Sequence, residues 1–238
     1  MGKHWNRLKR SLGRRWRESR LPRGYERLGT RYGGWWLDTR LVGSRPLLID
    51  CGLGEDISFP VAFLQRFADA RVIGVDPNPR SLAYCRAHCP SGMEILAKAL
   101  WTTAGETLAF HLPRSQEHLP KGADGVSGSL DSSHEYVAGG ERIEAQSIDL
   151  DGLLAHAGRT ECDVLKLDVE GAEYALLEAL IGSGRIDAAR QVLVEFHHGA
   201  TRHTLDDTLR IVGRLAAAGH QLMHTEGRNY IFRRNTAR

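Results

Sequence analysis

The chain has 238 residues, of which 42% are hydrophobic and 26% are charged, and its formal net charge is +3. This composition is that of a soluble globular protein, and the length suits one α/β domain that needs no disulfide or metal for its stability. Because no run of 18 apolar residues occurs and residues 1–23 lack the apolar segment of a secretory signal, we expect a cytoplasmic protein with no membrane-spanning helix.

The first 23 residues differ in charge from the rest of the chain. They contain nine Lys and Arg residues against one Glu, a net charge of +8, so the remaining chain carries −5. Apolar residues recur there at helical spacing: Trp5, Leu8, Leu12 and Trp16. Such an amphipathic helix would suit peripheral contact with an anionic membrane, although docking on the protein's own body is the reading we favour. We therefore divide the chain into a basic segment with a connector, residues 1–31, and one domain, residues 32–238.

Apolar runs alternate with helically spaced segments from residue 46 onward. The runs predict strands over residues 47–51, 71–75, 93–97, 164–167 and 191–196. The helical spacing predicts helices over residues 57–67, 81–88 (capped by Ser81), 149–157, 171–181 and 205–218. Residues 220–224 and 229–233 are separated by a short turn and are typical of an antiparallel pair. The predicted fold class is therefore α/β: a doubly wound, mostly parallel, seven-stranded Rossmann-like sheet with an antiparallel terminal strand pair.

The stretch of residues 101–147 interrupts this alternation. Residues 107–112 and 141–147 alternate between apolar and polar side chains, as strands do, and residues 121–140 between them are rich in Gly, Ser, Asp and His. We interpret the stretch as a hairpin inserted into the same domain. Its loop would close over a substrate as a lid. His134 could then reach the site, although a histidine in such a loop is more often merely exposed.

A glycine-containing loop follows the first predicted strand. Gly52 and Gly54 come directly after Asp50 and Cys51, and Asp76 ends the next strand, 22 residues after Gly54. Glycines at the carboxyl end of a strand let a ligand approach the backbone, and an acid at the end of the next strand accepts hydrogen bonds from ribose hydroxyls. Two nucleoside cofactors fit this arrangement, namely NAD and S-adenosylmethionine.

The side chains of the loop favour the second cofactor. The NAD fingerprint requires a third glycine where this chain has Ile57, and the carboxylates of Glu55 and Asp56 would repel a pyrophosphate. S-adenosylmethionine has no phosphate and carries a sulfonium and an ammonium group. Ala99, after the third strand, would flank the adenine. The predicted cofactor-binding residues are Asp50, Gly52, Gly54, Asp56, Asp76, Pro77 and Ala99.

Three carboxylates lie within six residues after the fourth predicted strand: Asp168, Glu170 and Glu173. A carboxylate near the start of a helix gains about 0.3–1 kcal/mol from the helix dipole, which suffices to explain Glu173. The dipole does not explain an acid at the end of the strand itself. We therefore expect Asp168 to face the transferring methyl group or the acceptor.

Residues 165–173 read Leu-Lys-Leu-Asp-Val-Glu-Gly-Ala-Glu. This stretch resembles the K-[IML]-D-[VI]-E-G-A-E signature of the FkbM family of S-adenosylmethionine-dependent methyltransferases. Shorter matches support the resemblance, which spans about residues 32–232: Asp50-Cys51-Gly52, Asp76-Pro77, Ala99-Leu100, residues 148–154 and residues 194–198. Many members have D-x-G-A-N-x-G after the first strand, whereas residues 52–59 read Gly-Leu-Gly-Glu-Asp-Ile-Ser-Phe, which is similar to a subgroup with G-x-G-E-D-I-S-F.

The resemblance implies methylation of an oxygen atom on a sugar, a glycolipid or a glycosylated metabolite. An alcohol is a weak nucleophile and benefits from a base. The candidate catalytic residues are Asp168, as our first choice, and His197, His198 and Glu195. We predict no metal, although Asp168, Glu195 and a histidine would be the set to hold a divalent ion.

The expected partner is a small-molecule or glycan substrate. Because the main domain is mildly acidic, we expect no nucleic-acid binding. Two readings from other classes stay open at this point. One is an NAD-dependent oxidoreductase, and the other is a non-catalytic module that binds a nucleotide or an anionic surface.

Overall fold

The computed structural model describes residues 21, 23–114, 126–137 and 139–235. The predicted amphipathic helix, which falls within residues 1–20, and the first residues of the predicted lid, 121–125, lie outside this part of the chain. Within the described residues, no helix is both long enough and apolar enough to cross a membrane.

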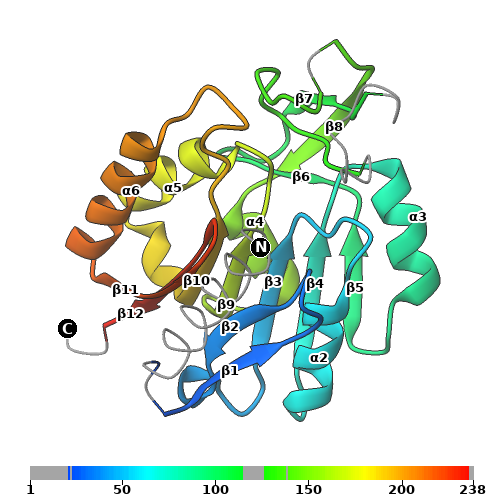
Figure 1. Ribbon diagram of the computed structural model, residues 1–238. Coiled ribbons are helices and arrows are strands. Elements are labelled where there is room, and N and C mark those ends of the chain that lie inside the picture. The colour runs from blue at the N-terminus through cyan, green and yellow to red at the C-terminus, as the bar shows by residue number, and fades with distance from the viewer. Residues whose placement is uncertain (1–20, 22, 115–125, 138, 236–238) are drawn as a thin grey trace, which may run out of the picture.

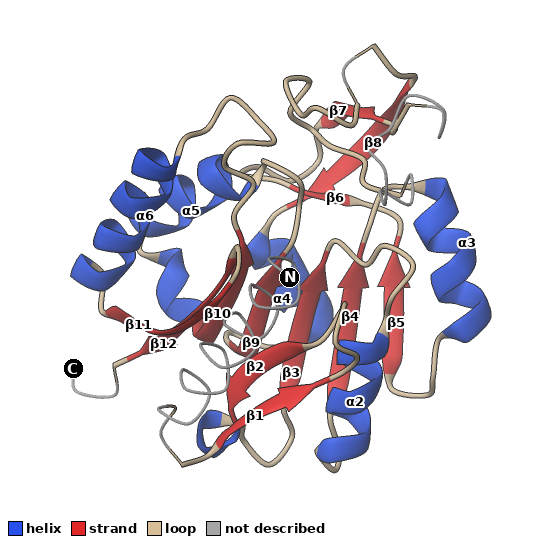
Figure 2. Ribbon diagram, in the orientation of Figure 1, coloured by secondary structure: helices blue, strands red, loops and turns tan. Residues whose placement is uncertain are grey.

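A seven-stranded sheet forms the centre of the molecule, with helices against both of its faces (Figures 1 and 2). In spatial order its strands are β11 (His220–Glu226), β12 (Asn229–Arg234), β10 (Ala189–Glu195), β9 (Cys162–Leu167), β3 (Leu47–Cys51), β4 (Arg71–Val75) and β5 (Met93–Leu96). The strands from β10 to β5 are parallel, and β12 pairs antiparallel with both β10 and β11. The predicted α/β class with a mostly parallel seven-stranded sheet is confirmed.

The parallel strands are buried on both faces, so successive residues of a strand enter opposite cores. The main helices are α2 (Ser58–Arg66), α3 (Pro79–His88), α4 (Leu150–Ala157), α5 (Glu173–Gly182) and α6 (Leu205–Ala217). In β3, Leu47 and Ile49 pack into the core that contains α4, α5 and α6, whereas Leu48 packs into the core that contains α2. Burial on both faces explains why these strands read as continuous apolar runs.

The start of α3 differs from the prediction. The helix begins at Pro79, and its cap is Asn78, whose side chain accepts a hydrogen bond from the backbone N–H of Arg80 at 3.0 Å. Ser81 is fully buried inside the helix, so the prediction that Ser81 is the cap was wrong. A proline at the first helical position fits, because its N–H group would have no partner there in any case.

An antiparallel hairpin lies where we predicted a connector. Strands β1 (Tyr25–Leu28) and β2 (Trp35–Asp38) pair with each other and pack on the α2 side of the sheet. The side chain of Gln191 holds β2, because it accepts a hydrogen bond from the N–H of Asp38 at 2.7 Å and donates one to its carbonyl at 3.1 Å. The strand β1 lies inside residues 1–31, which we predicted to be a basic segment with a connector, so that prediction was wrong for residues 25–28.

A smaller sheet is built from the stretch between β5 and α4. In spatial order its strands are β6 (Ala99–Leu100), β8 (Arg142–Ile148) and β7 (Thr107–His111). β7 and β8 are antiparallel, and β6 runs parallel to β8. The described lid residues return from this sheet towards the end of β9, where the hydroxyl of Ser129 donates a hydrogen bond to the carbonyl of Glu170 at 2.5 Å.

Candidate active site

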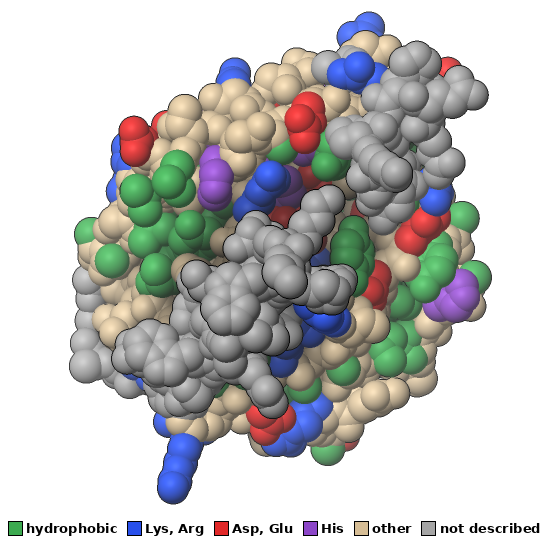
Figure 3. Space-filling view, in the orientation of Figure 1, with side chains coloured by type: hydrophobic (Ala, Val, Ile, Leu, Met, Phe, Trp, Pro, Cys, Tyr) green, Lys and Arg blue, Asp and Glu red, His purple; other side chains and the backbone are tan. Residues whose placement is uncertain are grey.

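A cavity of about 860 Å³ lies at the carboxyl ends of the parallel strands. It is lined by the ends of β3, β4, β9 and β10, by the loop between β1 and β2, by lid residues and by the turn between β11 and β12. Acidic, basic and histidine side chains gather near the centre of this face of the molecule (Figure 3). The volume lies within the range of about 300–1,000 Å³ that small-molecule sites span, near its upper end.

Most of the predicted site residues line this cavity: Gly52, Gly54, Asp56, Asp76, Pro77, Ala99, Asp168, Glu195 and His197. Two predicted residues are not among the described residues that line it. Asp50 is buried beneath the cavity floor and pairs with Lys166. The Nδ1 atom of His198 lies 3.2 Å from the hydroxyl of Thr208 on α6.

Asp76 organises the glycine loop. One of its carboxylate oxygens accepts hydrogen bonds from the N–H groups of Leu53 and Gly54 at 2.9 and 3.3 Å, and the other accepts one from Asn78 at 2.8 Å. Burial raises the pKa of Asp76, although these three hydrogen bonds act in the opposite direction. A carboxylate has about four acceptor positions, so roughly one remains for a ribose hydroxyl, where we had expected the carboxylate to accept from two.

Asp56 connects the glycine loop to the β1–β2 hairpin. Its carboxylate accepts hydrogen bonds from the hydroxyl of Thr30 at 2.7 Å, from the N–H of Gly33 at 3.2 Å and from the N–H of Ser58 at 2.8 Å. Burial alone would raise the pKa of Asp56, but these hydrogen bonds lower it. Asp56 therefore acts here through the backbone that it holds in place.

A buried ion pair lies under the floor of the cavity. Asp50 and Lys166 are cross-strand partners in β3 and β9, and the Nζ atom of Lys166 is 2.9 Å from Asp50 Oδ1 and 2.6 Å from the carbonyl of Gly52. The ring of Trp35 lies over this ammonium group at 5.8 Å. Burial raises the pKa of Asp50, and Lys166 opposes that shift. Because Lys166 is held by these partners, it fixes the end of β9 against the glycine loop.

The loop between β9 and α5 has an unusual backbone. Glu170 and Gly171 have φ angles of 52° and 108°, so α5 begins at Glu173 and not at Gly171 as predicted. Glu173 is fully buried, and its carboxylate accepts hydrogen bonds from the N–H groups of Gly171 at 2.7 Å and His197 at 2.8 Å. The helix dipole therefore does not suffice to explain Glu173, because this carboxylate joins the ends of β9 and β10.

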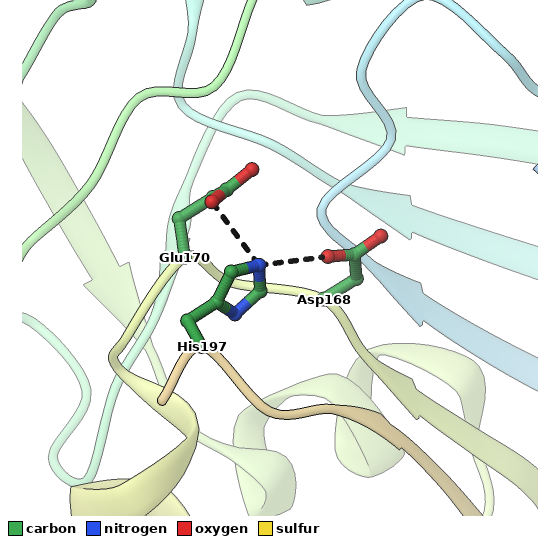
Figure 4. A group of neighbouring side chains, drawn as sticks. All are labelled: Asp168, Glu170 and His197. Atoms are coloured by element: carbon green, nitrogen blue, oxygen red, sulfur yellow. Dashed lines mark ion pairs between the residues drawn. The ribbon is translucent and has the colours of Figure 1, made fainter. Parts of the chain in front are cut away.

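Three side chains converge above the ends of these two strands (Figure 4). The Nε2 atom of His197 is 3.1 Å from Glu170 Oε2 and 3.8 Å from Asp168 Oδ1. Its Nδ1 atom is 3.2 Å from Glu173. His134, a lid residue that is fully buried, has its Nε2 atom 2.9 Å from Glu170 Oε2, so it does reach the site.

The protonation of this cluster follows from its charges. Burial alone would lower the pKa of His197, but Glu170 and Glu173 raise it to about 10. Burial and the nearby carboxylate of Glu195 raise the pKa of Asp168 above its ordinary value. His197 consequently carries a proton at neutral pH in the metal-free protein and is a poor base there, whereas Asp168 is a stronger base than an ordinary carboxylate.

Sequence reasoning missed the roles of Lys166, Glu170 and Glu173. A signal for Lys166 was present, because a single lysine in a continuous apolar run must find a buried partner. The family signature contains Glu170 and Glu173, but it does not give their roles, and no periodicity separates them from acids that merely begin a helix. Their roles depend on the positive φ angle at Glu170 and on contacts with β10, which is distant in sequence.

Comparisons with known proteins identify the family of the chain. The family model described as "Methyltransferase FkbM domain" matches residues 50–222. A search of curated proteins found no match. Among solved structures, the chain is similar to the pyocyanin biosynthetic protein PhzM, with 14% identity, a TM-score of 0.38, and coverage of 82% of this chain and 52% of that chain. It is also similar to a SAM-dependent methyltransferase from Aquifex aeolicus, with 11% identity, a TM-score of 0.34 and 81% coverage of each chain.

This chain thus spans about half the length of PhzM. The TM-scores are too low for either protein to indicate the substrate of this chain. The family match is different, because it covers most of the chain and contains the β9 signature, the glycine loop and the buried ion pair. The chain belongs to the FkbM family of methyltransferases.

Proposed function

We propose that the protein transfers the methyl group of S-adenosylmethionine to a hydroxyl group on a sugar, a glycolipid or a glycosylated metabolite. The observation that carries this proposal is that one cavity contains both parts that the reaction needs. The glycine loop held by Asp76 lies on one side, and the carboxylates of Asp168 and Glu195 lie at the neighbouring strand ends.

The chemistry of the cavity wall suits a cationic cofactor. Carboxylates line it from the glycine loop to the end of β10: Glu55, Asp56, Asp76, Asp168, Glu170 and Glu195. The basic side chains of the same lining, Arg27, Arg31, Lys166 and Arg228, come from other elements than the glycine loop. The acidic glycine loop and its partner Asp76 therefore favour a cationic group and disfavour the pyrophosphate of NAD, which supports the methyltransferase over the oxidoreductase. S-adenosylmethionine supplies an electrophilic methyl group when it is bound.

The protein's own contribution is alignment, exclusion of water and removal of a proton. The backbone N–H of Asp168 donates a hydrogen bond to the carbonyl of Cys51 at 3.0 Å, which fixes the main chain from which its carboxylate projects. We assign Asp168 as the base that takes the proton of the acceptor hydroxyl, because its raised pKa suits that task. The buried Lys166 holds the floor rigid, which favours a single productive alignment.

The polar lining of the cavity supports a hydroxyl-rich acceptor. Arg31, Glu195, Arg228 and Asn229 belong to this lining, and these side chains supply both hydrogen-bond donors and acceptors. A polyol such as a sugar presents hydroxyl groups that can bond to both kinds. An acceptor without polar groups would leave these side chains unpaired.

The test begins with two calorimetric titrations, one with S-adenosylhomocysteine and one with NAD. We expect S-adenosylhomocysteine to bind with a Kd in the micromolar range, and a Kd of about 1 μM corresponds to a binding free energy of about −8 kcal/mol. We expect no heat of binding with NAD. Labelled S-adenosylmethionine is then incubated with the protein and a panel of sugars, nucleotide sugars, glycolipids and amines. Label on nitrogen acceptors alone would overturn the hydroxyl assignment, and binding of NAD alone would overturn the cofactor assignment.

A further inference from the structure

We propose that Asp168, Glu170 and His197 form a binding site for one divalent transition-metal ion. One ligand atom from each residue lies within 4.8 Å of the other two. The residues come from the adjoining ends of β9 and β10 and from the loop that follows β9, so the sheet itself positions them. The site contains Glu170, which was absent from the set of donors that the sequence suggested.

The separations between donor atoms agree with a shared ion. Ligand atoms at about 2.1 Å from one ion lie about 3.0–3.4 Å apart in octahedral or tetrahedral shells. His197 Nε2 is 3.1 Å from Glu170 Oε2 and 3.8 Å from Asp168 Oδ1. A shift of a few tenths of an ångström by the Asp168 side chain would bring its separation from His197 into this range.

The orientation of His197 provides a second and independent observation. Its backbone N–H and its Nδ1 atom both lie against the fully buried carboxylate of Glu173, at 2.8 and 3.2 Å. With Nδ1 against Glu173, the Nε2 atom faces the oxygens of Asp168 and Glu170. In the metal-free protein a proton on Nε2 lies between these oxygens, and a divalent ion bound at the same place would replace that proton. A carboxylate behind the distal ring nitrogen is also the usual support of a metal-binding histidine.

Glu170 is held in place at a cost in backbone energy. Its φ angle of 52° lies in the left-handed region, which is uncommon for a residue with a side chain. Ser129 Oγ donates to its carbonyl at 2.5 Å, and His134 Nε2 lies 2.9 Å from its carboxylate. Strained residues that are fixed by several neighbours gather at ligand sites, and here the strain directs the carboxylate towards His197.

The charges of the surroundings also call for a cation. Four carboxylates meet at the ends of β9 and β10: Asp168, Glu170, Glu173 and Glu195. The nearest lysine, Lys166, is held by Asp50 at 2.9 Å and is 3.7 Å from Asp168. Two carboxylate oxygens and one imidazole nitrogen form a mixed donor set that suits Mn²⁺, Fe²⁺ or Zn²⁺ better than Mg²⁺ or Ca²⁺.

The consequence for catalysis rests on the proposed function. An ion at this place would bind the acceptor hydroxyl and lower its pKa, as divalent ions do for bound water. Asp168 would then serve as a ligand, and the proton would pass to Glu195, which lines the same cavity. The O–CH₃ bond would form as the S–CH₃ bond breaks, so no oxidant or reductant is needed.

The experiment is a titration of the full, chelator-stripped protein with Mn²⁺, in which the electron paramagnetic resonance signal of free Mn²⁺ reports binding. We expect one site per chain, with Zn²⁺ competing for it. Glu170→Gln and His197→Gln should each weaken binding by about 100-fold. Glu173→Gln, which keeps the size of the side chain behind His197, should weaken it by about 10- to 100-fold.

The matched control is Glu226→Gln. This residue also lines the cavity, but its carboxylate pairs with Arg27 at 3.3 Å, so the variant should bind Mn²⁺ within about twofold of the wild type. Absence of binding up to about 1 mM Mn²⁺ and Zn²⁺ would overturn the inference, as would tight binding that survives both Glu170→Gln and His197→Gln. S-adenosylhomocysteine is titrated into the same samples, so a protein that binds the nucleoside and no metal contradicts this inference alone.

Discussion

The carbonyl oxygen of Asp168 occupies the space in which a Cβ atom on Gly52 would lie. A Cβ at residue 52 would be only 1.7 Å from that oxygen, and the φ angle of Gly52 is 83°. The close approach follows from the pairing of β3 with β9, because the N–H of Asp168 also donates to the carbonyl of Cys51 at 3.0 Å. The glycine loop and the proposed base are thus packed directly against each other.

Gly52→Ala should therefore destabilise the protein strongly. The clash is with backbone, which cannot turn aside, so the free energy of unfolding should fall by at least about 3 kcal/mol in urea denaturation. Gly54→Ala is the matched control, because a Cβ there would meet only Val126 at 4.0 Å and Gly54 has a φ angle of 56°. It should lose only the cost of a left-handed alanine, about 1–2 kcal/mol. Equal losses in the two variants would contradict the packing argument.

Lys166→Met should lower the stability of the protein, because it breaks the buried ion pair with Asp50. Asp50 would remain buried without its partner, so we expect a loss of about 3–5 kcal/mol in the free energy of unfolding. Asp50→Asn combined with Lys166→Met should be less destabilising than Lys166→Met alone. A double-mutant cycle by urea denaturation measures this coupling, and additive losses would argue against a paired floor.

Asp76→Asn should weaken cofactor binding through the glycine loop. An amide cannot accept all three N–H groups that the carboxylate accepts, so the affinity for S-adenosylhomocysteine should fall by about 1.5–3 kcal/mol. Glu26→Gln is the control, because Glu26 forms an exposed ion pair with Arg66, is not among the described residues that line the cavity, and should change the affinity by less than about 1 kcal/mol. Calorimetric titration compares the two, and the prediction fails if Glu26→Gln has the larger effect.

Asp168→Asn should slow methyl transfer by about 10²–10⁴-fold and leave the affinity for S-adenosylhomocysteine close to that of the wild type. Both roles discussed for Asp168, base and metal ligand, require its charge. His198→Gln is the comparison, because His198 contacts Thr208 and should change the rate by no more than about threefold. A rate that survives Asp168→Asn would leave Glu195 to take the proton.

His220 should make the stability of the protein depend on pH. It is fully buried, its Nε2 atom lies 3.2 Å from the carbonyl of Ala189, and burial lowers its pKa although Asp187 acts in the opposite direction. The unfolded chain takes up a proton near pH 6.5 and the folded chain only at lower pH, so the stabilisation is complete above about pH 6.5 and is lost below it. The difference in unfolding free energy between wild type and His220→Gln should therefore shrink from about pH 8 to about pH 5.

Elements with strong local patterns could be predicted from the sequence. The continuous apolar runs at β3, β4 and β9 have one stable arrangement, a parallel sheet covered on both faces, and the positions of Gly52 and Asp76 follow from it. The strands β1 and β2 were not predicted, because each has only four residues. They are stabilised by contacts with Gln191 and with the main sheet, which the alternation of apolar and polar residues along a strand does not reveal.

The site was predictable only in part. Asp168 and His197 lie at strand ends, and topology alone brings strand ends together. Only one of the two adjacent histidines, His197 and His198, can face the cavity. Glu173, which lies 24 positions before His197 in the chain, accepts a hydrogen bond from the backbone N–H of His197 and so holds that histidine at the cavity. Contacts of this kind carry no periodicity, so a single sequence does not reveal them.

The β1–β2 hairpin decides where an engineer can shorten this protein or join it to another. The hairpin loop is held by Asp56, and the ring of Trp35 lies over the ammonium group of Lys166, so the hairpin covers the Asp50–Lys166 ion pair. A truncation between residues 31 and 32 would remove β1 and expose the Asp50–Lys166 ion pair to water. A fusion junction placed ahead of Tyr25 keeps both strands. Because Tyr25 pairs with Asp38, which Gln191 holds near the start of β10, a partner attached there would lie at the end of the sheet opposite the cavity.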